Sequence, residues 1–148
     1  MSAAPSLNTF GAILSFAIDL EARLGEYYSA AGAQAAAGEA ADLAEQFEEY
    51  ARKSARRGQR LTAIRQEHVT EMILEPISGL NAADYLIDFD AQAAGADALA
   101  EAIRLETRAE RFYAEAGPKL NVTEARRAFQ RLAQENAERL AALHAVAG

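Results

Sequence analysis

Hydrophobic residues recur at steps of three and four in four long stretches of the chain, which is the period of an amphipathic helix. These stretches cover approximately residues 7–31, 40–74, 94–116 and 122–146. No stretch alternates apolar and polar residues over a β-rich composition, so we expect no strands. The pattern therefore predicts an all-α protein of one four-helix domain over residues 1–148.

Glycine and proline mark the ends of these stretches. We expect Gly32 to end the first helix in a left-handed cap, and Pro76 to stop the second. Gly117 and the proline after it are a stop signal for the third. Short turns join the first helix to the second and the third to the fourth, whereas a long crossover of about 75–93 joins the two pairs. We therefore predict two antiparallel helical hairpins joined by a long crossover.

The crossover is rich in apolar residues, and Asn81 is placed to cap a short helix over 82–87. The apolar residues at its start and along it are Met72, Ile73, Leu74, Ile77, Leu80, Tyr85, Leu86, Ile87 and Phe89. Two interpretations stay open: these residues pack on their own bundle, or part of this face makes a contact between two copies of the chain.

One helical segment occurs twice in the chain. Residues 17–32 read AIDLEARLGEYYSAAG and residues 102–117 read AIRLETRAERFYAEAG, at a constant offset of 85. Each copy places a glutamate, Glu21 or Glu106, among apolar neighbours. A repeat that keeps an ionisable residue in register with apolar ones predicts a pseudo-symmetric bundle with polar groups at its centre.

The second and fourth helices also match, at an offset of 82, and this pairs Ser54 with Asn136 and Arg57 with Arg139. The three- and four-residue steps of the fourth helix place Asn136 and Arg139 inside its apolar stripe. The same steps place Ser54 and Arg57 inward on the second helix.

A glutamate with a tyrosine seven residues later, then a helix reading Phe-x-x-x-Ala, both repeated after a long crossover, resembles the rubrerythrin branch of the ferritin-like superfamily. The resemblance covers about residues 7–146 and implies a ferritin-like four-helix bundle. It also implies a di-iron centre held by one Glu from each of the first and third helices and a Glu-x-x-His from each of the others. The positions of this chain that match those ligands are Glu21, Ser54, Arg57, Glu106, Asn136 and Arg139.

Four of these six positions depart from the family pattern. Glu21 and Glu106 keep a ligand, but a serine and an asparagine replace the other glutamates, and arginines replace both histidines. A guanidinium group is always protonated and does not bind a dication. Two glutamates and two arginines sum to zero charge, so we hypothesise that ion pairs replace the metals. Side chains that reach solvent and a retained metal site are the alternatives.

The resemblance and these departures lead to two expected functions. The first is a metal-free, rubrerythrin-like structural or protein-interaction module, with no catalytic residue, no cofactor and an expected homodimeric state. The second is a divergent di-metal oxidoreductase or peroxide scavenger using iron or another divalent metal. A one-residue shift of register in the fourth helix, bringing Glu135 or Glu138 to the centre, would favour the second.

Composition narrows the remaining classes. The absence of cysteine excludes disulfides, thiolate metal sites and a cysteine nucleophile. A net charge of −7 argues against nucleic-acid binding, although Arg52, Lys53, Arg56 and Arg57 form a local basic run flanked by acidic residues. With no apolar run long enough for a membrane span and no secretory signal, we expect no membrane association and a cytoplasmic protein. Composition indicates no particular protein partner.

The two histidines give little indication of a metal site. His68 lies among Glu67, Glu71 and Glu75, where it could share a metal with Glu71, but a solvated or capping role is the simpler interpretation. We expect His144 in the last turn of the fourth helix, where a protonated imidazole suits the helix dipole.

Overall fold

The computed structural model describes residues 6–38, 40–68, 76–89 and 96–147. Its helices are α1 (Phe10–Ala37), α2 (Ala41–Glu67), α3 (Ala96–Ala116) and α4 (Thr123–Ala147), with short 3-10 helices η2 (Ala82–Asp84) and η3 (Gly117–Lys119). The described residues contain no strand. The all-α prediction is therefore confirmed, and none of the described helices is long and apolar enough to cross a membrane.

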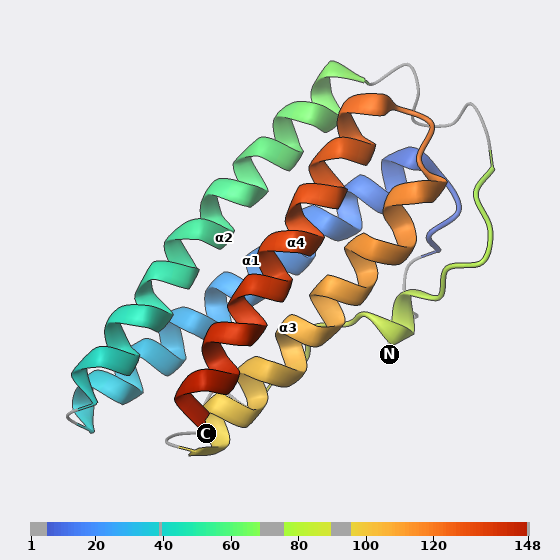
Figure 1. The fold of residues 1–148 in the computed structure, drawn as a ribbon. Coiled ribbons are helices and arrows are strands. Elements are labelled where there is room, and N and C mark those ends of the chain that lie inside the picture. Colours follow the sequence, from blue (N-terminus) through green and yellow to red (C-terminus); the bar gives the residue numbers. More distant parts are fainter. Residues whose placement is uncertain (1–5, 39, 69–75, 90–95, 148) are drawn as a thin grey trace.

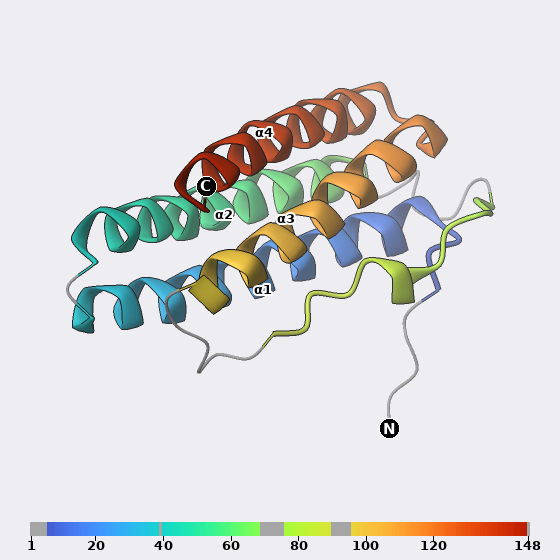
Figure 2. The same ribbon diagram turned by 60° about the horizontal axis from the view of Figure 1, so that its bottom comes forward.

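The helices form two layers. α1 packs against α2, and α3 packs against α4, each pair running antiparallel (Figure 1). Turned by 60°, the molecule shows α2 and α4 in one layer and α1 and α3 in the other (Figure 2). Because α1 and α3 also run in opposite directions, the connection from α2 to α3 has to return along the length of the bundle. The four described helices therefore lie in two antiparallel pairs.

The described part of the crossover lies along the α1 and α3 layer (Figure 2). Two arginines that occupy the same position in the repeat hold it there. Arg23 Nε donates to the Ile87 carbonyl at 3.2 Å, and Arg108 Nη1 donates to the Leu86 carbonyl at 2.6 Å. The repeat therefore fixes the path of the crossover as well as the centre of the bundle.

The apolar residues of the crossover mostly cover its own bundle. Tyr85 and Ile87 are buried, and the Tyr85 ring lies 5.4 Å from that of Phe112. Leu86 stays 39% exposed. Of the apolar set identified above, residues 72–74 lie outside the described part of the chain.

The predicted short helix of the crossover is present but shorter than expected. The Asn81 side chain accepts a hydrogen bond from the Ala83 amide at 3.1 Å, which confirms the predicted cap. The structure forms only the three residues of η2 in place of the predicted 82–87.

The prediction that Gly32 ends the first helix is wrong. α1 continues to Ala37. Gly32 instead allows a close approach of α2, since a Cβ at this position would lie 3.3 Å from the Glu48 Cγ. Its repeat partner Gly117 faces Phe129 in the same way, at 3.2 Å. The two glycines therefore share a packing role, and only Gly117 also coincides with a helix end.

The remaining boundaries agree with prediction to within about three residues, apart from the end of the second helix. α3 ends at Ala116, immediately before the predicted stop. α2 ends at Glu67, with His68 as its C-cap, short of the predicted end at 74. Residues 69–75 lie outside the described part of the chain.

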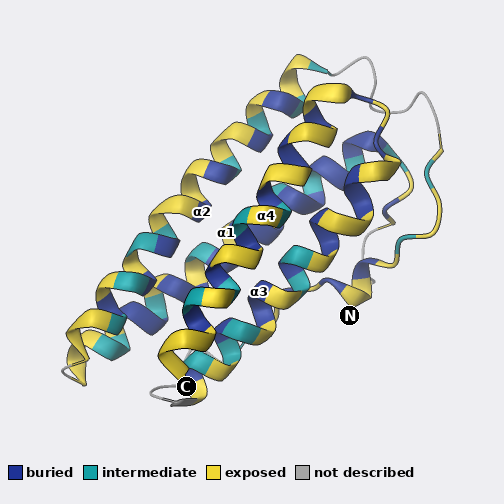
Figure 3. Cartoon of the chain, viewed as in Figure 1, coloured by how far each residue is buried: buried dark blue, intermediate teal, exposed yellow. Residues whose placement is uncertain are grey.

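The buried faces of the four helices point toward one another, and the exposed faces point outward (Figure 3). Each copy of the repeat contributes one aromatic pair to the core. Tyr28 packs on Phe47 with ring centroids 5.6 Å apart, and Tyr113 packs on Phe129 at 5.0 Å. These two pairs occupy equivalent positions, so each hairpin builds its half of the core with the same residues.

Candidate functional site

The buried polar and charged residues among those described are Glu21, Ser54, Arg57, Glu106, Asn136 and Arg139. They are the same six that the repeat places at the centre of the bundle. Each helix contributes, because each carries one or two of these residues on its apolar stripe. The prediction of a polar centre is therefore confirmed, and the alternative in which the arginines reach solvent is wrong, since Arg57 and Arg139 are 7% and 5% exposed.

Glu106, on α3, is fully satisfied. Its Oε2 accepts hydrogen bonds from the Tyr28 hydroxyl at 2.6 Å and from Arg139 Nη1 at 3.1 Å. Its Oε1 accepts from Asn136 Nδ2 at 2.8 Å. Three donors, one of them cationic, therefore occupy both oxygens of this buried carboxyl group.

Glu21, on α1, is satisfied far less well. Its Oε2 accepts from the Tyr113 hydroxyl at 2.6 Å and lies 3.6 Å from Arg57 Nη1, which is an ion pair without a hydrogen bond. Its Oε1 is buried and has no hydrogen-bond partner among the described residues. Burial raises the pKa of the Glu21 carboxyl, and the nearby Arg57 offsets only part of that effect.

The guanidinium of Arg57 bridges the centre and the surface. Its Nη1 donates to Asn136 Oδ1 at 3.0 Å, and its Nη2 donates to Glu135 Oε1 at 3.0 Å. The Glu135 side chain is 45% exposed, and Asn136 is fully buried. The shifted register that would bring Glu135 or Glu138 to the centre is therefore wrong, because Asn136 occupies that inner position and Glu138 is exposed.

Arg139 has a different environment. Its Nη1 donates to Ser54 Oγ at 3.4 Å as well as to Glu106, and its guanidinium carbon lies 4.9 Å from the centre of the Tyr50 ring. Burial alone would lower the pKa of Arg139, but the charge of Glu106 and the neighbouring Tyr28 and Glu21 raise it. Arg139 therefore remains a buried cation at every pH at which the fold exists.

Two tyrosines join the halves of the centre crosswise. Tyr28 on α1 donates to Glu106 on α3, and Tyr113 on α3 donates to Glu21 on α1. Burial, followed by the neighbouring carboxylates, raises the pKa of both phenols well above the usual value. Both hydroxyls therefore stay protonated and act as fixed hydrogen-bond donors.

The donor set does not fit the two metal ions that the ferritin-like resemblance implies. Hard dications bind carboxylate and carbonyl oxygens or neutral imidazoles. A guanidinium cation stands beside each glutamate here, Arg57 beside Glu21 and Arg139 beside Glu106. The remaining groups, a serine hydroxyl and an asparagine amide, carry no charge. The arginines neutralise both carboxylates, which leaves no negative charge for a metal to balance.

A second group of possible metal ligands lies at the C-terminal end of α2. Carboxylate or imidazole atoms of Glu67, His68 and Glu124 come within 4.8 Å of one another. His68 Nε2 already lies 2.9 Å from Glu124 Oε1, so an ion pair or hydrogen bond between α2 and α4 accounts for this group. The predicted partner Glu71 lies outside the described residues. His144 is exposed in the last turn of α4, as expected.

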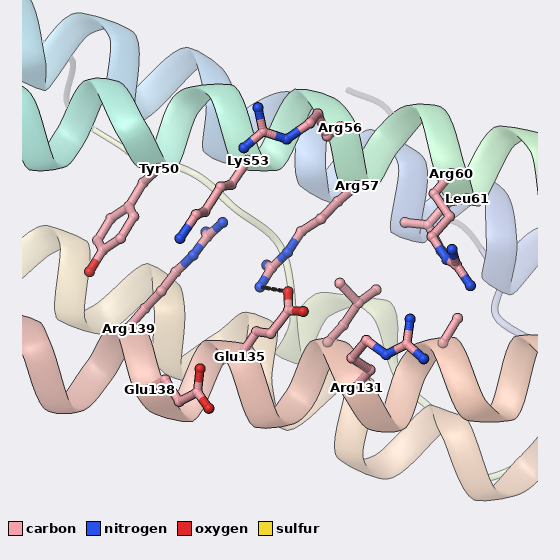
Figure 4. A pocket seen from close by; sticks show the side chains of 12 residues that line it. Tyr50, Lys53, Arg56, Arg57, Arg60, Leu61, Arg131, Glu135, Glu138 and Arg139 are labelled. Atoms are coloured by element: carbon pink, nitrogen blue, oxygen red, sulfur yellow. Dashed lines mark hydrogen bonds and ion pairs between the residues drawn. The ribbon is translucent and has the colours of Figure 1, made fainter.

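Arg57 and Arg139 also line a hollow between α2 and α4 (Figure 4). Lys53, Arg56 and Arg57 belong to the basic run noted in the sequence, whereas Arg60 and Arg131 were not singled out there. Lys53, Arg56, Arg57 and Arg60 lie at positions i, i+3, i+4 and i+7 of α2. This is the spacing of one helical face, and it is the signal that could have grouped Arg60 with the run.

A comparison with the models of known protein families finds no match for this chain, and a comparison with curated proteins finds none either. The functional inference therefore rests on the geometry of the centre and of the hollow beside it.

Proposed function

We propose that the protein is a metal-free, rubrerythrin-like bundle that acts as a structural or protein-interaction module, with a Glu–Arg network in place of a di-iron centre. One observation carries the proposal: a buried guanidinium stands beside each of the two buried glutamates, at 3.6 Å and 3.1 Å. Removing one partner of such a pair typically costs about 3–5 kcal/mol, so the arginines are expected to be structural requirements of this fold.

The ferritin-like relationship is part of the same proposal. It is supported by the single long crossover between two antiparallel hairpins, which is the ferritin-like connection among four-helix bundles. It is also supported by the burial of Ser54, Arg57, Asn136 and Arg139 at the positions where the resemblance expects ligands.

We propose that the module forms a homodimer. The described crossover leaves Leu86 as its exposed large hydrophobic residue, 39% exposed, on the face opposite the buried Tyr85 and Ile87. Light scattering at micromolar concentration should give twice the 15.9 kDa mass of one chain. A mass of one chain would remove the homodimer from the proposal without affecting the metal-free centre.

Elemental analysis of protein purified without chelator or added metal tests the absence of a metal. We expect iron, manganese and zinc all well below one ion per chain. Stoichiometric metal would overturn the proposal and favour the divergent di-metal oxidoreductase or peroxide scavenger.

A designed variant tests the ferritin-like register. Ser54→Glu and Asn136→Glu together with Arg57→His and Arg139→His would restore a Glu-x-x-His pattern on α2 and on α4. We expect this folded quadruple variant to bind two ferrous ions per chain, with the unmodified protein as the control. A helical variant that binds none would contradict the ferritin-like register while leaving the metal-free centre of the natural protein untouched.

A further inference from the structure

We propose that the hollow between α2 and α4 binds a small phosphorylated organic molecule. The hollow, called the α2–α4 groove below, is lined by Tyr50, Lys53, Arg56, Arg57, Arg60, Leu61, Ala128, Arg131, Leu132, Glu135, Glu138 and Arg139. This proposal goes beyond the function proposed above and does not depend on it.

The groove has the size of a small-molecule site. It encloses about 490 Å³, within the range of about 300–1,000 Å³ that is usual for ligand pockets. α2 and α4 are not tightly packed on each other as α1 and α2 are, and long side chains from both helices reach into the space between them (Figure 4). Cations from the two helices therefore face a common volume.

The charge of the groove is opposite to that of the chain. Six of its lining residues are cations and two are carboxylates, which gives a formal excess of four positive charges. The whole chain carries a net charge of −7. Glu135 already pairs with Arg57. Arg139 pairs with Glu106 and Lys53 with Glu49. This leaves Arg56, Arg60 and Arg131 without an ion pair among the described residues, so an anion entering the groove gains Coulombic energy from these three arginines.

The inner wall of the groove is fixed by the buried centre. Arg57 and Arg139 are more than nine-tenths buried, and their hydrogen bonds to Asn136 and Glu106 set the orientation of both guanidinium groups. Arg57 Nε and Arg139 Nη2 have no acceptor among the described residues. A buried donor without an acceptor typically costs about 1–3 kcal/mol. Both arginines also line the groove, so an anion bound there lies beside guanidinium groups that still have an unsatisfied donor.

The lining selects for a phosphate attached to an organic group. A phosphate monoester carries about −1.5 to −2 charge at neutral pH, and its oxygens match the planar fork of arginine. A monocarboxylate carries a single negative charge and balances the arginines of the groove only in part. Arg60 on α2 and Arg131 on α4 both line the groove, toward the end where Leu61 is also drawn (Figure 4). The apolar lining residues Leu61, Ala128 and Leu132 offer a surface for the organic part of the ligand.

The surroundings favour a small ligand over a long polyanion. Glu135 and Glu138 lie on the α4 side of the groove, and the acidic charge of the rest of the chain opposes a nucleic acid or an acidic peptide that extends beyond it. A ligand contained in the groove avoids that repulsion.

Isothermal titration calorimetry with pyrophosphate, ADP and citrate tests the proposal at low ionic strength. The variant is the double substitution Arg60→Gln/Arg131→Gln within the groove. The matched control is Arg52→Gln/Arg127→Gln, which removes the same charge from exposed positions of the same two helices outside the groove. Circular dichroism verifies that both variants stay helical.

We expect saturable binding of ADP and pyrophosphate, and weaker binding of citrate. The groove variant should bind ADP at least about tenfold more weakly, whereas the control should change the affinity less than about twofold. The arginine Nε–Hε NMR signals of Arg57 and Arg139 should shift on addition of ADP.

Three results would overturn the proposal. The first is no saturable binding of ADP or pyrophosphate up to about 1 mM. The second is an equal loss of affinity in the groove and control variants, because general charge would then account for it. The third is tighter binding of a single-stranded oligonucleotide or a poly-glutamate peptide than of ADP, which would assign the groove to a macromolecular partner.

Discussion

The two halves of the buried centre place equivalent residues at equivalent positions, but their glutamates differ in how many hydrogen bonds they receive. In the α3–α4 half, Glu106 receives three hydrogen bonds that use both of its oxygens. In the α1–α2 half, Glu21 receives one hydrogen bond, and its Oε1 has no partner among the described residues. Part of the difference arises at one pair of equivalent positions. The Asn136 amide is long enough to reach Glu106, whereas the Ser54 hydroxyl forms no hydrogen bond with Glu21 and accepts one from Arg139.

A second pair of equivalent positions separates the arginines. Glu135 supplies Arg57 with a carboxylate at 3.0 Å, but the corresponding residue of α2 is Lys53, which cannot accept from Arg139. Arg139 therefore depends on Glu106 alone for a charged hydrogen-bond partner. The repeated backbone thus buries equivalent residues to the same depth. The length of the side chain at 54 or 136, and its charge at 53 or 135, then decide how many hydrogen bonds the buried charged groups form.

The largest difference should come from neutralising each glutamate in turn. Glu106→Gln leaves Arg139 as an unpaired buried cation and turns an amide donor toward Asn136, so we expect a loss of about 3–5 kcal/mol in unfolding free energy. Glu21→Gln should cost less than about 1 kcal/mol, because Arg57 keeps Glu135 and Asn136 as acceptors. Urea denaturation at pH 7, followed by circular dichroism, measures both. Equal losses would mean that the two halves are energetically equivalent.

A smaller difference should separate the two neutral residues. Asn136→Ala removes hydrogen bonds to Glu106 and from Arg57, and we expect it to cost about 2–3 kcal/mol. Ser54→Ala removes a single bond of 3.4 Å and should cost about 0.5 kcal/mol. The same denaturation assay compares them. A Ser54→Ala cost as large as that of Asn136→Ala would contradict the role assigned to the amide.

The smallest difference should be a dependence of stability on pH that comes from Glu21. Burial raises its pKa above the ordinary value of 4.5, so the folded protein holds this proton to higher pH than the unfolded chain does. The contribution of Glu21 is therefore greatest below pH 4.5 and is lost as pH rises through the raised pKa, with a slope no steeper than about 1.4 kcal/mol per pH unit.

Comparing Glu21→Gln with the natural protein isolates this effect. The groups that face Glu21 are Tyr113, Arg57, Arg139 and Glu106, and they are the same in both proteins. We expect the variant to gain stability relative to the natural protein as pH rises from 4.5 to 8. A difference that is constant over this range would show that Glu21 titrates normally.

Much of the centre could be predicted from the sequence because helical periodicity determines which residues point inward. The offsets of 85 and 82, together with the three- and four-residue steps, predict that Glu21, Arg57 and their counterparts lie on buried faces, and the structure buries all four. The end of α1 could not be predicted in this way. Gly32 carries the signature of a cap, but in the structure it allows α2 to approach α1 closely at Glu48.

The inequality of the two halves was also beyond prediction. It depends on whether the side chain at the inner position, an amide or a shorter hydroxyl, reaches the glutamate, and periodicity does not resolve this. The α2–α4 groove was missed for a different reason. Its cations come from helices far apart in the sequence, such as Arg60 and Arg131, and they share a volume only once the hairpins are packed.

The crosswise tyrosine bonds have a consequence for how the molecule comes apart. Tyr28 and Tyr113 each anchor on a glutamate of the opposite hairpin. Separating the hairpins therefore breaks both of these buried hydrogen bonds at the same moment. The two hairpins should therefore unfold as one cooperative unit, and amide hydrogens at the middle of α1 and of α3 should exchange with solvent at closely similar rates.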